Sequence, residues 1–144
     1  MEQQYRYVTA QGLEKLPQAA AIREEVFVEE QGFHNEFDDI DRQAVHLVVM
    51  DGETPVAAGR VYWEEDCKVW HVGRVCVRKP WRGKELGRLV MEGLEKEARK
   101  RGAEELMLSA QVQARGFYEK LGYSAYGGEY LDEHCPHIAM KKIC

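Results

Sequence analysis

The sequence predicts a single α/β domain, residues 1–144, built on a mixed and mostly antiparallel central sheet flanked by helices. Three runs rich in β-branched and aromatic residues lie between residues 45 and 77, and turn residues separate them, as in an antiparallel meander. The third run continues through a basic, glycine-containing turn into an amphipathic helix and a further apolar run. Because a strand–helix–strand unit joins parallel strands, the sheet must be mixed.

The composition indicates an ordinary soluble globular protein. A chain of 144 residues can bury about two-thirds of its unfolded surface. No apolar run approaches the roughly 18 residues of a membrane helix, and the N-terminus lacks the profile of a secretion signal. We therefore expect a cytoplasmic protein without a membrane partner. The net charge of −5 argues against nucleic acid as the main partner.

The cysteines and acidic clusters predict no metal site. The segment from His134 to His137 is too tightly spaced for structural zinc, and the acidic residues 36–41 do not match a calcium loop. A catalytic role is one option for Cys76, but a small buried hydrophobe is favoured. Without a CxxC pair or a secretion signal, we expect free thiols at all four cysteines, Cys67, Cys76, Cys135 and Cys144.

The first third of the chain is predicted as a strand, a helix and a loop. Alternation favours a strand over Tyr5–Thr9, and helical spacing begins near Gly12. Because Pro17 suits the first turn of a helix, the true start is placed near Leu16. The acidic stretch Gln31–Gln43 is predicted as a solvated loop, with the lining of a substrate entrance as one role.

Arg23 is the unusual residue of this helix because it lies close to the apolar face. The favoured interpretation is that its side chain extends to solvent along the apolar face or forms an ion pair with Glu24 or Glu30. The alternative is a cation that lines a pocket for an anionic group.

Three strands are expected next, followed by the strand–helix–strand unit. The helix starts near Leu86 and ends at Gly102, and the strand Glu104–Ala110 should lie parallel to the third meander strand. A short helix and a closing hairpin complete the chain. The meander strands are Val45–Met50, Val56–Trp63 and Lys68–Val77, and the last three elements are Gln113–Leu121, Tyr123–Tyr130 and His137–Ile143.

The stretch Val75–Leu94 carries the main functional signal. A strand, a basic glycine turn and a helix aim backbone N–H groups and a helix N-terminus at a phosphate. The turn is neither a P-loop nor a dinucleotide fingerprint, because their glycine spacings are absent.

This stretch resembles the acyl-CoA pyrophosphate loop of the GNAT superfamily of N-acetyltransferases, whose pattern is Q/R-x-x-G-x-G/A. Arg82 takes the first position and Gly87 the last. The segment Gln111–Tyr123 resembles the second landmark of that family, N-x-x-A-x-x-F-Y-x-K-x-G-F, with glutamine for the usual asparagine. The resemblance implies acetyl-CoA as co-substrate, bound by Val75, Cys76, Val77, Arg82, Gly83, Lys84, Glu85, Leu86, Gly87, Arg88, Gln111 and Tyr118.

The resemblance also implies catalytic roles. The strand Val75–Val77 would run beside the pantetheine arm and polarise the thioester carbonyl, and Tyr118 would protonate the leaving thiolate. A core aromatic role is the alternative for Tyr118. Glu85 departs from the family because it replaces the middle glycine. We expect ordinary helical angles for Glu85 in the first helical turn, and a weaker but not abolished CoA site.

The acceptor site follows from a second resemblance. The segment Pro136–Met140 resembles the Pro-His-x-x-Met segment of a small GNAT branch that includes the glyphosate N-acetyltransferases. This implies that His137 is the general base and that Arg23 and Arg74 bind acidic groups of the acceptor. A structural histidine is an equal alternative for His137, and Glu129 is the second candidate base.

We therefore predict a domain with a centrally splayed sheet that moves an acetyl group from acetyl-CoA to a small amine by direct attack on the thioester. The alternatives are transfer of a longer acyl group, acetylation of a protein N-terminus or lysine, and a non-catalytic CoA-sensing domain, which Glu85 motivates. The oligomeric state stays open, with a homodimer as one option.

Overall fold

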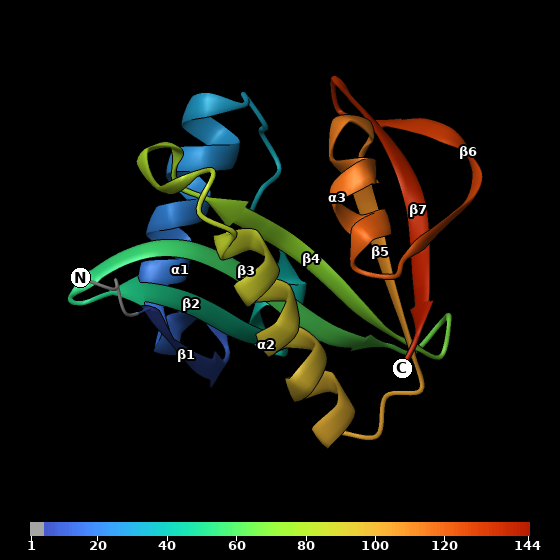
Figure 1. Ribbon diagram of the computed structural model, residues 1–144, viewed down its shortest axis with the longest axis horizontal. Coiled ribbons are helices and arrows are strands. Elements are labelled where there is room, and N and C mark those ends of the chain that lie inside the picture. The colour runs from blue at the N-terminus through green and yellow to red at the C-terminus, as the bar shows by residue number, and fades with distance from the viewer. Residues whose placement is uncertain (1–4) are drawn as a thin grey trace.

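The computed structural model describes residues 5–144 and confirms the predicted mixed sheet flanked by helices (Figure 1). Seven strands lie in the order β1-β2-β3-β4-β5-β7-β6, and only the β4–β5 pair is parallel. The strands are β1 (Tyr5–Gln11), β2 (Val45–Asp51), β3 (Thr54–Glu64), β4 (Val69–Val77), β5 (Glu105–Gln111), β6 (Ser124–Asp132) and β7 (Cys135–Ile143). The α-helices are α1 (Pro17–Arg23), α2 (Leu86–Lys100) and α3 (Arg115–Lys120).

Short 3-10 and π segments connect these elements. The first helix continues without interruption from α1 into the π-helix η2, and 3-10 turns precede α1, α2 and α3. The predicted start near Leu16 agrees with this arrangement, because Pro17 occupies the first helical position of α1. These segments are η1 (Leu13–Lys15), η2 (Glu24–Glu30), η3 (Asp39–Arg42), η4 (Lys79–Trp81) and η5 (Val112–Ala114).

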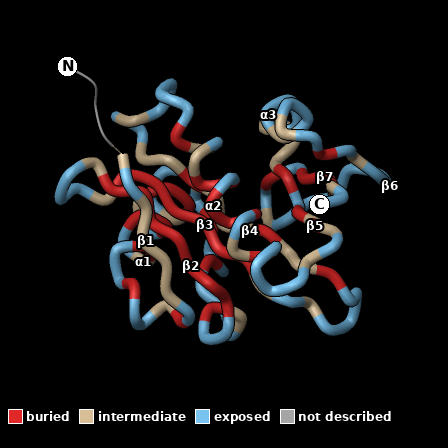
Figure 2. Tube along the Cα trace, turned by 60° about the horizontal axis from the view of Figure 1, so that its bottom comes forward, coloured by how far each residue is buried: buried red, intermediate tan, exposed pale blue. Residues whose placement is uncertain are grey.

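Helices cover both faces of the central strands, of which β2 is buried almost throughout and β3 along its middle (Figure 2). Along β2, Leu47 and Val49 belong to the core beneath α2, whereas Val48 and Met50 belong to the core beneath α1. This division follows from the pleat, which sends successive side chains to opposite faces. The continuous apolar run of β2 therefore reflects burial on two faces.

The helix α2 lies very close to β3. A Cβ at Gly59 would lie 2.7 Å from Cγ1 of Val90 and 2.8 Å from Cδ1 of Leu94, so only glycine allows this approach. Leu94 is fully buried, and a core leucine of this kind stabilises the fold by about 2–5 kcal/mol relative to alanine. This close packing fixes the N-terminus of α2 relative to the end of β4.

The sheet splays between β4 and β5. These strands pair only where Trp70–Val72 meets Leu106–Leu108, and beyond that point they diverge (Figure 1). The β3–β4 register shifts at the same place, because two residues of β4, Arg74 and Val75, lie opposite the single residue Gly59. Arg74 has a positive φ of 54°. Such a bulge bends the strand and increases its twist, which opens the sheet.

The segment 31–43 is a largely exposed loop, as predicted, but two of its acidic side chains are not solvated. Glu36 and Asp41 are each only 5% exposed, and a 3-10 turn (η3) lies within the segment. Their carboxylates are buried because arginine side chains pair with them. Among the described residues 5–144, no helix has the length and apolar character needed to cross a membrane.

Candidate active site

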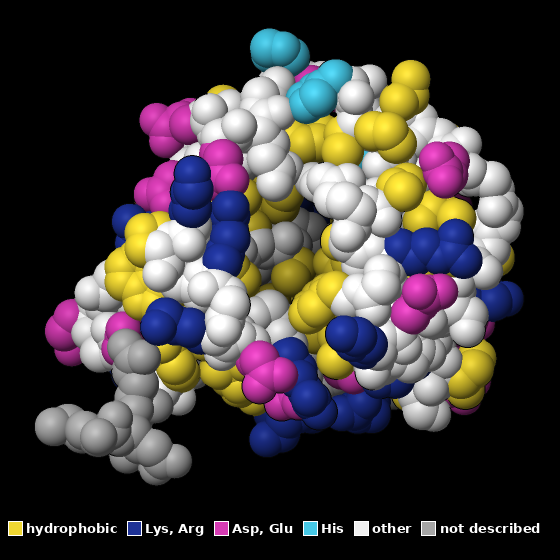
Figure 3. Space-filling model, turned by 45° about the horizontal axis from the view of Figure 1, so that its top comes forward, with side chains coloured by type: hydrophobic (Ala, Val, Ile, Leu, Met, Phe, Trp, Pro, Cys, Tyr) yellow, Lys and Arg dark blue, Asp and Glu magenta, His cyan; other side chains and the backbone are white. Residues whose placement is uncertain are grey.

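A cavity of about 790 Å³ occupies the splay, within the size range of small-molecule sites (Figure 3). Figure 3 shows the hollow with hydrophobic side chains on its walls and Lys or Arg side chains near its rim. Most residues predicted to bind CoA line this cavity, and only Lys84 does not. The predicted residues on its wall are Val75, Cys76, Val77, Arg82, Gly83, Glu85, Leu86, Gly87, Arg88, Gln111, Tyr118, Arg74 and His137.

The glycine turn enters α2 through a left-handed residue. Glu85 is the N-cap of the helix and has φ 61° and ψ 25°, so the expectation of ordinary helical angles is wrong. The chain leaves Gly83, which also has a positive φ of 83°, and reverses direction at Glu85 before the first turn of α2. The Glu85 side chain is exposed to solvent. This position therefore favours glycine on backbone grounds, although it carries glutamate.

The N-terminus of α2 faces the cavity with unpaired donors. Leu86, Gly87 and Arg88 form the first helical turn, whose N–H groups have no intrahelical acceptor, and all three line the cavity. These groups and the helix dipole create a positive region suited to a phosphate. A Cβ at Gly87 would lie 3.1 Å from Cζ of Phe117, so glycine here allows α3 to pack over the turn.

Arg82 anchors the turn to its surroundings. Its Nε donates to the Val77 carbonyl over 2.9 Å, and its two Nη atoms donate to Glu30 over 2.6 and 2.7 Å. The hydrogen bond from Arg82 is the main cause of a lowered pKa at Glu30. The guanidinium of Arg82 is therefore occupied by protein partners.

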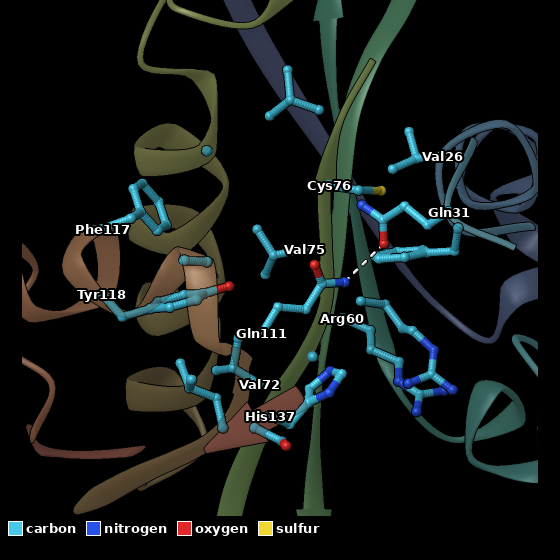
Figure 4. A pocket seen from close by; sticks show the side chains of 18 of the residues that line it. Val26, Gln31, Arg60, Val72, Val75, Cys76, Gln111, Phe117, Tyr118 and His137 are labelled. Atoms are coloured by element: carbon cyan, nitrogen blue, oxygen red, sulfur yellow. Dashed lines mark hydrogen bonds between the residues drawn. The ribbon is translucent and has the colours of Figure 1, made fainter. Parts of the chain in front are cut away.

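Tyr118 projects from α3 toward β4 (Figure 4). Burial is the main cause of its raised pKa, and the neighbouring Cys76 adds to the shift, so the phenol is protonated at neutral pH. Cys76 is buried on β4, and burial raises the pKa of its thiol to about 12. A neutral thiol is a poor nucleophile, which favours the interpretation of Cys76 as a small buried hydrophobe.

His137 lies near the start of β7 and lines the cavity. Its Nδ1 is 2.9 Å from the Cys135 carbonyl oxygen, which can only accept a hydrogen bond. Nδ1 therefore carries the proton, and the lone pair of Nε2 is free in the neutral ring. Phe33 and Tyr130 hold the ring, with centroids 6.3 and 6.1 Å away. Glu129 lies on the exposed strand β6 and does not line the cavity.

Arg23 is not a cavity residue. It is 1% exposed, and its Nε and Nη1 each lie 2.8 Å from carboxylate oxygens of Glu36 and Asp41. Its partners are thus neither Glu24 nor Glu30. The role of Arg23 as a direct acceptor ligand is corrected on this ground, because its guanidinium is enclosed in the protein and fully occupied.

Arg23 belongs to a buried ionic network of three arginines and three carboxylates. Burial alone would raise the pKa of Asp41, but the hydrogen bond and charge of Arg23 and the charge of Arg60 lower it to about 2. Arg74 reaches the cavity wall, although its Nε and Nη2 donate to the Glu36 carbonyl. The network is formed by Arg23, Glu36, Asp38, Asp41, Arg60 and Arg74.

Gln31 also lines the cavity, and nothing in the sequence pointed to it. Its Oε1 accepts a hydrogen bond of 2.8 Å from Gln111 (Figure 4). His71, whose side chain the sequence also offers as a candidate base, lines the wall with its Nδ1 2.9 Å from Glu64. The glutamine pair joins positions 80 residues apart, which no local pattern reveals. Within residues 5–144, no group of three or more His, Cys, Asp or Glu side chains is placed to hold a metal ion.

Comparisons with known proteins agree with this geometry. Residues 8–144 match a family model described as an acetyltransferase (GNAT) domain. The chain is 41% identical over 138 residues to the uncharacterized N-acetyltransferase YjcF of Bacillus subtilis (strain 168), an alignment that covers 94% of this chain and 97% of YjcF.

Solved structures show the same fold. An acyl-CoA N-acyltransferase from Pseudomonas aeruginosa has a TM-score of 0.84 at 26% identity, over 96% of this chain and 99% of that chain. Escherichia coli ElaA has a TM-score of 0.85 at 24% identity over the same fractions, which supports the fold alone.

Proposed function

The chain belongs to the GNAT family of acetyltransferases, and from that premise we propose that it transfers an acetyl group from acetyl-CoA to a small amine by direct attack of the amine on the thioester. One observation carries the proposal: a single cavity joins a phosphate-suited helix N-terminus, a protonated phenol at Tyr118 and a free imidazole lone pair at His137. Anion binding, an acid and a base are the parts that this reaction requires.

The donor would bind along the splay. First-turn amides of α2, from Leu86 to Arg88, would hold the pyrophosphate, and Arg82 would support the turn through Glu30. Because pairing between β4 and β5 ends at Val72, the edge of β4 from Val75 to Val77 faces the cavity unpaired by β5. Its backbone groups can therefore bind an amide-containing arm, as an added strand would.

The reaction would use His137 and Tyr118 as base and acid. Nε2 of His137 takes a proton from the acceptor amine. At the same time the amine nitrogen forms a C–N bond to the thioester carbonyl carbon. Backbone N–H groups near Val75 stabilise the tetrahedral oxyanion. When the C–S bond breaks, Tyr118 donates its proton to the sulfur, and the products are an amide and the free thiol of CoA.

The acceptor would bind on the His137 side of the cavity. Arg74 is the proposed contact for a polar group of the acceptor, because it lines the wall and is 24% exposed. Arg23 would act only by holding Glu36 in place. Since Glu36 and Asp38 already pair with Arg74, a neutral polar group suits this position better than a third anion.

Thermal melting and a thiol-release assay test the proposal. Millimolar acetyl-CoA should raise the melting temperature, and CoA thiol should be released with some members of a panel of acidic and neutral amines. Tyr118→Phe should lower kcat about 100-fold or more and leave acetyl-CoA affinity within about twofold. The absence of any melting shift would exclude the CoA site, whereas binding without turnover on the whole panel would favour a CoA-sensing domain.

A further inference from the structure

Two glutamine side chains span the cleft between the halves of the sheet. Nε2 of Gln111, at the end of β5, donates to Oε1 of Gln31, which follows η2, over 2.8 Å. Both residues line the cavity, and Figure 4 shows the bond between them as a dashed line. Gln113 extends the chain, because its Nε2 donates to Oε1 of Gln111 over 2.6 Å. We name the Gln31–Gln111 pair the crossbar.

The crossbar is held firmly at both ends. The backbone N–H of Gln31 donates to the backbone carbonyl of Val26 over 3.1 Å, which fixes the main chain at the end of η2. The following residues are tied to the β6–β7 turn, because the Glu133 carboxylate accepts the backbone N–H groups of His34 and Asn35 at 2.9 to 3.0 Å. Gln111 lies within the β5–β7 ladder opposite His137. An amide pair anchored in this way occupies a defined position in the cavity.

The position of the crossbar lies where an acyl group would extend. In Figure 4 the Gln111 side chain is drawn between Val75 and His137, and the Tyr118 phenol points toward it from α3. A thioester whose sulfur meets Tyr118 and whose carbonyl carbon meets an amine at His137 has its acyl group between them. The carbon chain of that acyl group must therefore pass beside the two amides.

We infer that the crossbar determines acyl-chain length, admitting acetyl and disfavouring longer acyl groups. This inference rests on the proposed acetyl transfer. A methyl group is small enough to lie beside the amide pair, whereas a longer chain must displace it and leave its polar groups without partners in a partly buried site. The loss of one hydrogen bond predicts a preference of about fivefold against the longer chain, or about 1 kcal/mol.

Matched variants separate the crossbar from general effects of substitution. Gln31→Ala and Gln111→Ala each remove the bond, and Gln31→Glu keeps a carboxylate oxygen that can accept from Gln111. Gln11→Ala is the control, because Gln11 also makes an amide hydrogen bond between segments, to the Gln43 carbonyl over 3.2 Å, and does not line the cavity. The double alanine variant tests whether the two residues act as one unit.

The experiment measures kcat/KM for acetyl-, propionyl-, butyryl- and hexanoyl-CoA with one accepted amine. The butyryl to acetyl ratio should rise about fivefold in both single alanine variants and no further in the double variant. It should stay within about twofold of the native value in Gln31→Glu and Gln11→Ala. An unchanged ratio in the alanine variants, or a ratio in Gln31→Glu as high as theirs, would overturn the inference.

Thermal stabilisation by each acyl-CoA distinguishes this failure from failure of the proposed function. If acetyl-CoA stabilises and is used by the native protein while the ratios stay constant, only the inference on the crossbar is overturned. If the native protein shows neither stabilisation by acetyl-CoA nor turnover, the proposed acetyl transfer is overturned and the crossbar inference falls with it.

Discussion

Glu85 combines a strained backbone with an unfavourable charge. A left-handed residue with a Cβ costs about 1–2 kcal/mol, and its carboxylate lies on the turn proposed to hold a pyrophosphate. Glu85→Gly removes both effects. Glycine also increases the conformational entropy of the unfolded chain, which lowers the free energy of unfolding by about 0.4–1 kcal/mol. We expect the free energy of unfolding to rise by up to about 1 kcal/mol and acetyl-CoA affinity to rise about fivefold.

Urea denaturation and calorimetric titration of acetyl-CoA measure the two effects of Glu85→Gly separately. Glu85→Ala is the matched control, because it removes the charge and keeps the Cβ. It should bind acetyl-CoA as tightly as Glu85→Gly and be less stable. Equal stability of the glycine and alanine variants would contradict the strain, and native affinity in both would contradict the charge effect.

The two histidines on the cavity wall differ in their partners, which allows a test of the base. Nδ1 of His137 is bound to a neutral carbonyl, whereas Nδ1 of His71 lies beside the Glu64 carboxylate, and burial lowers the pKa of His71. His137→Ala should lower kcat/KM about 100-fold and abolish the loss of rate at acidic pH. The pH–rate profiles of His137→Ala and His71→Ala decide the assignment. A retained acidic limb in His137→Ala would transfer the role to His71.

The buried ionic network joins α1, η3, β3 and β4 and makes stability depend on pH. Asp41 has a pKa of about 2 in the folded protein, below its ordinary value of 3.8. Its folded-state pKa is lowered, so its contribution is fully present above about pH 4 and is lost as the pH falls toward 2. The difference of nearly two units corresponds to about 2 kcal/mol.

Asp41→Asn should lower the free energy of unfolding by at least about 2 kcal/mol at pH 7, because it removes the buried carboxylate that Arg23 and Arg60 share and leaves only Glu36 and Asp38 to pair with them. The gap between variant and native protein should narrow as the pH falls from 4 to 2. Urea denaturation across this range measures both changes. Asp39→Asn is the control, since Asp39 is exposed on the same 3-10 turn. A gap that stays constant with pH would contradict the lowered pKa of Asp41.

The elements themselves could be predicted from the sequence, because they depend on local patterns. The periodicity of α2, the strand signals of β2 to β4 and the basic turn all lie within about 20 residues, and each agrees with the structure. The partners of Arg23 could not be predicted, because Glu36 and Asp41 follow an intervening loop. The backbone of Glu85 was predicted wrongly: the family pattern places a glycine at this position, but a glutamate at the start of a helix favours ordinary helical angles.

At the scale of the whole molecule, the sheet consists of two halves with few connections. The strands β1 to β4 form one half and β5 to β7 the other, and only Trp70–Val72 pairs directly with Leu106–Leu108 between them. The helix α2 packs against β2, β3 and β4 of the first half and leads along the chain to β5, and the cavity lies where β4 and β5 diverge. A molecule bound in the splay therefore contacts both halves at once and should couple their opening motions.

Hydrogen exchange tests this coupling. With saturating acetyl-CoA, amides of Val75–Val77, the first turn of α2 and α3 should exchange about tenfold or more slowly, because ligand contacts favour the closed state. Amides of β1, at the far edge of the sheet, should keep their native rates and serve as the internal control. Mass spectrometry of peptides from each segment measures the effect. Protection confined to the α2 turn would show that only the phosphate end binds, whereas protection on both sides of the splay supports a donor arm that runs between β4 and β5.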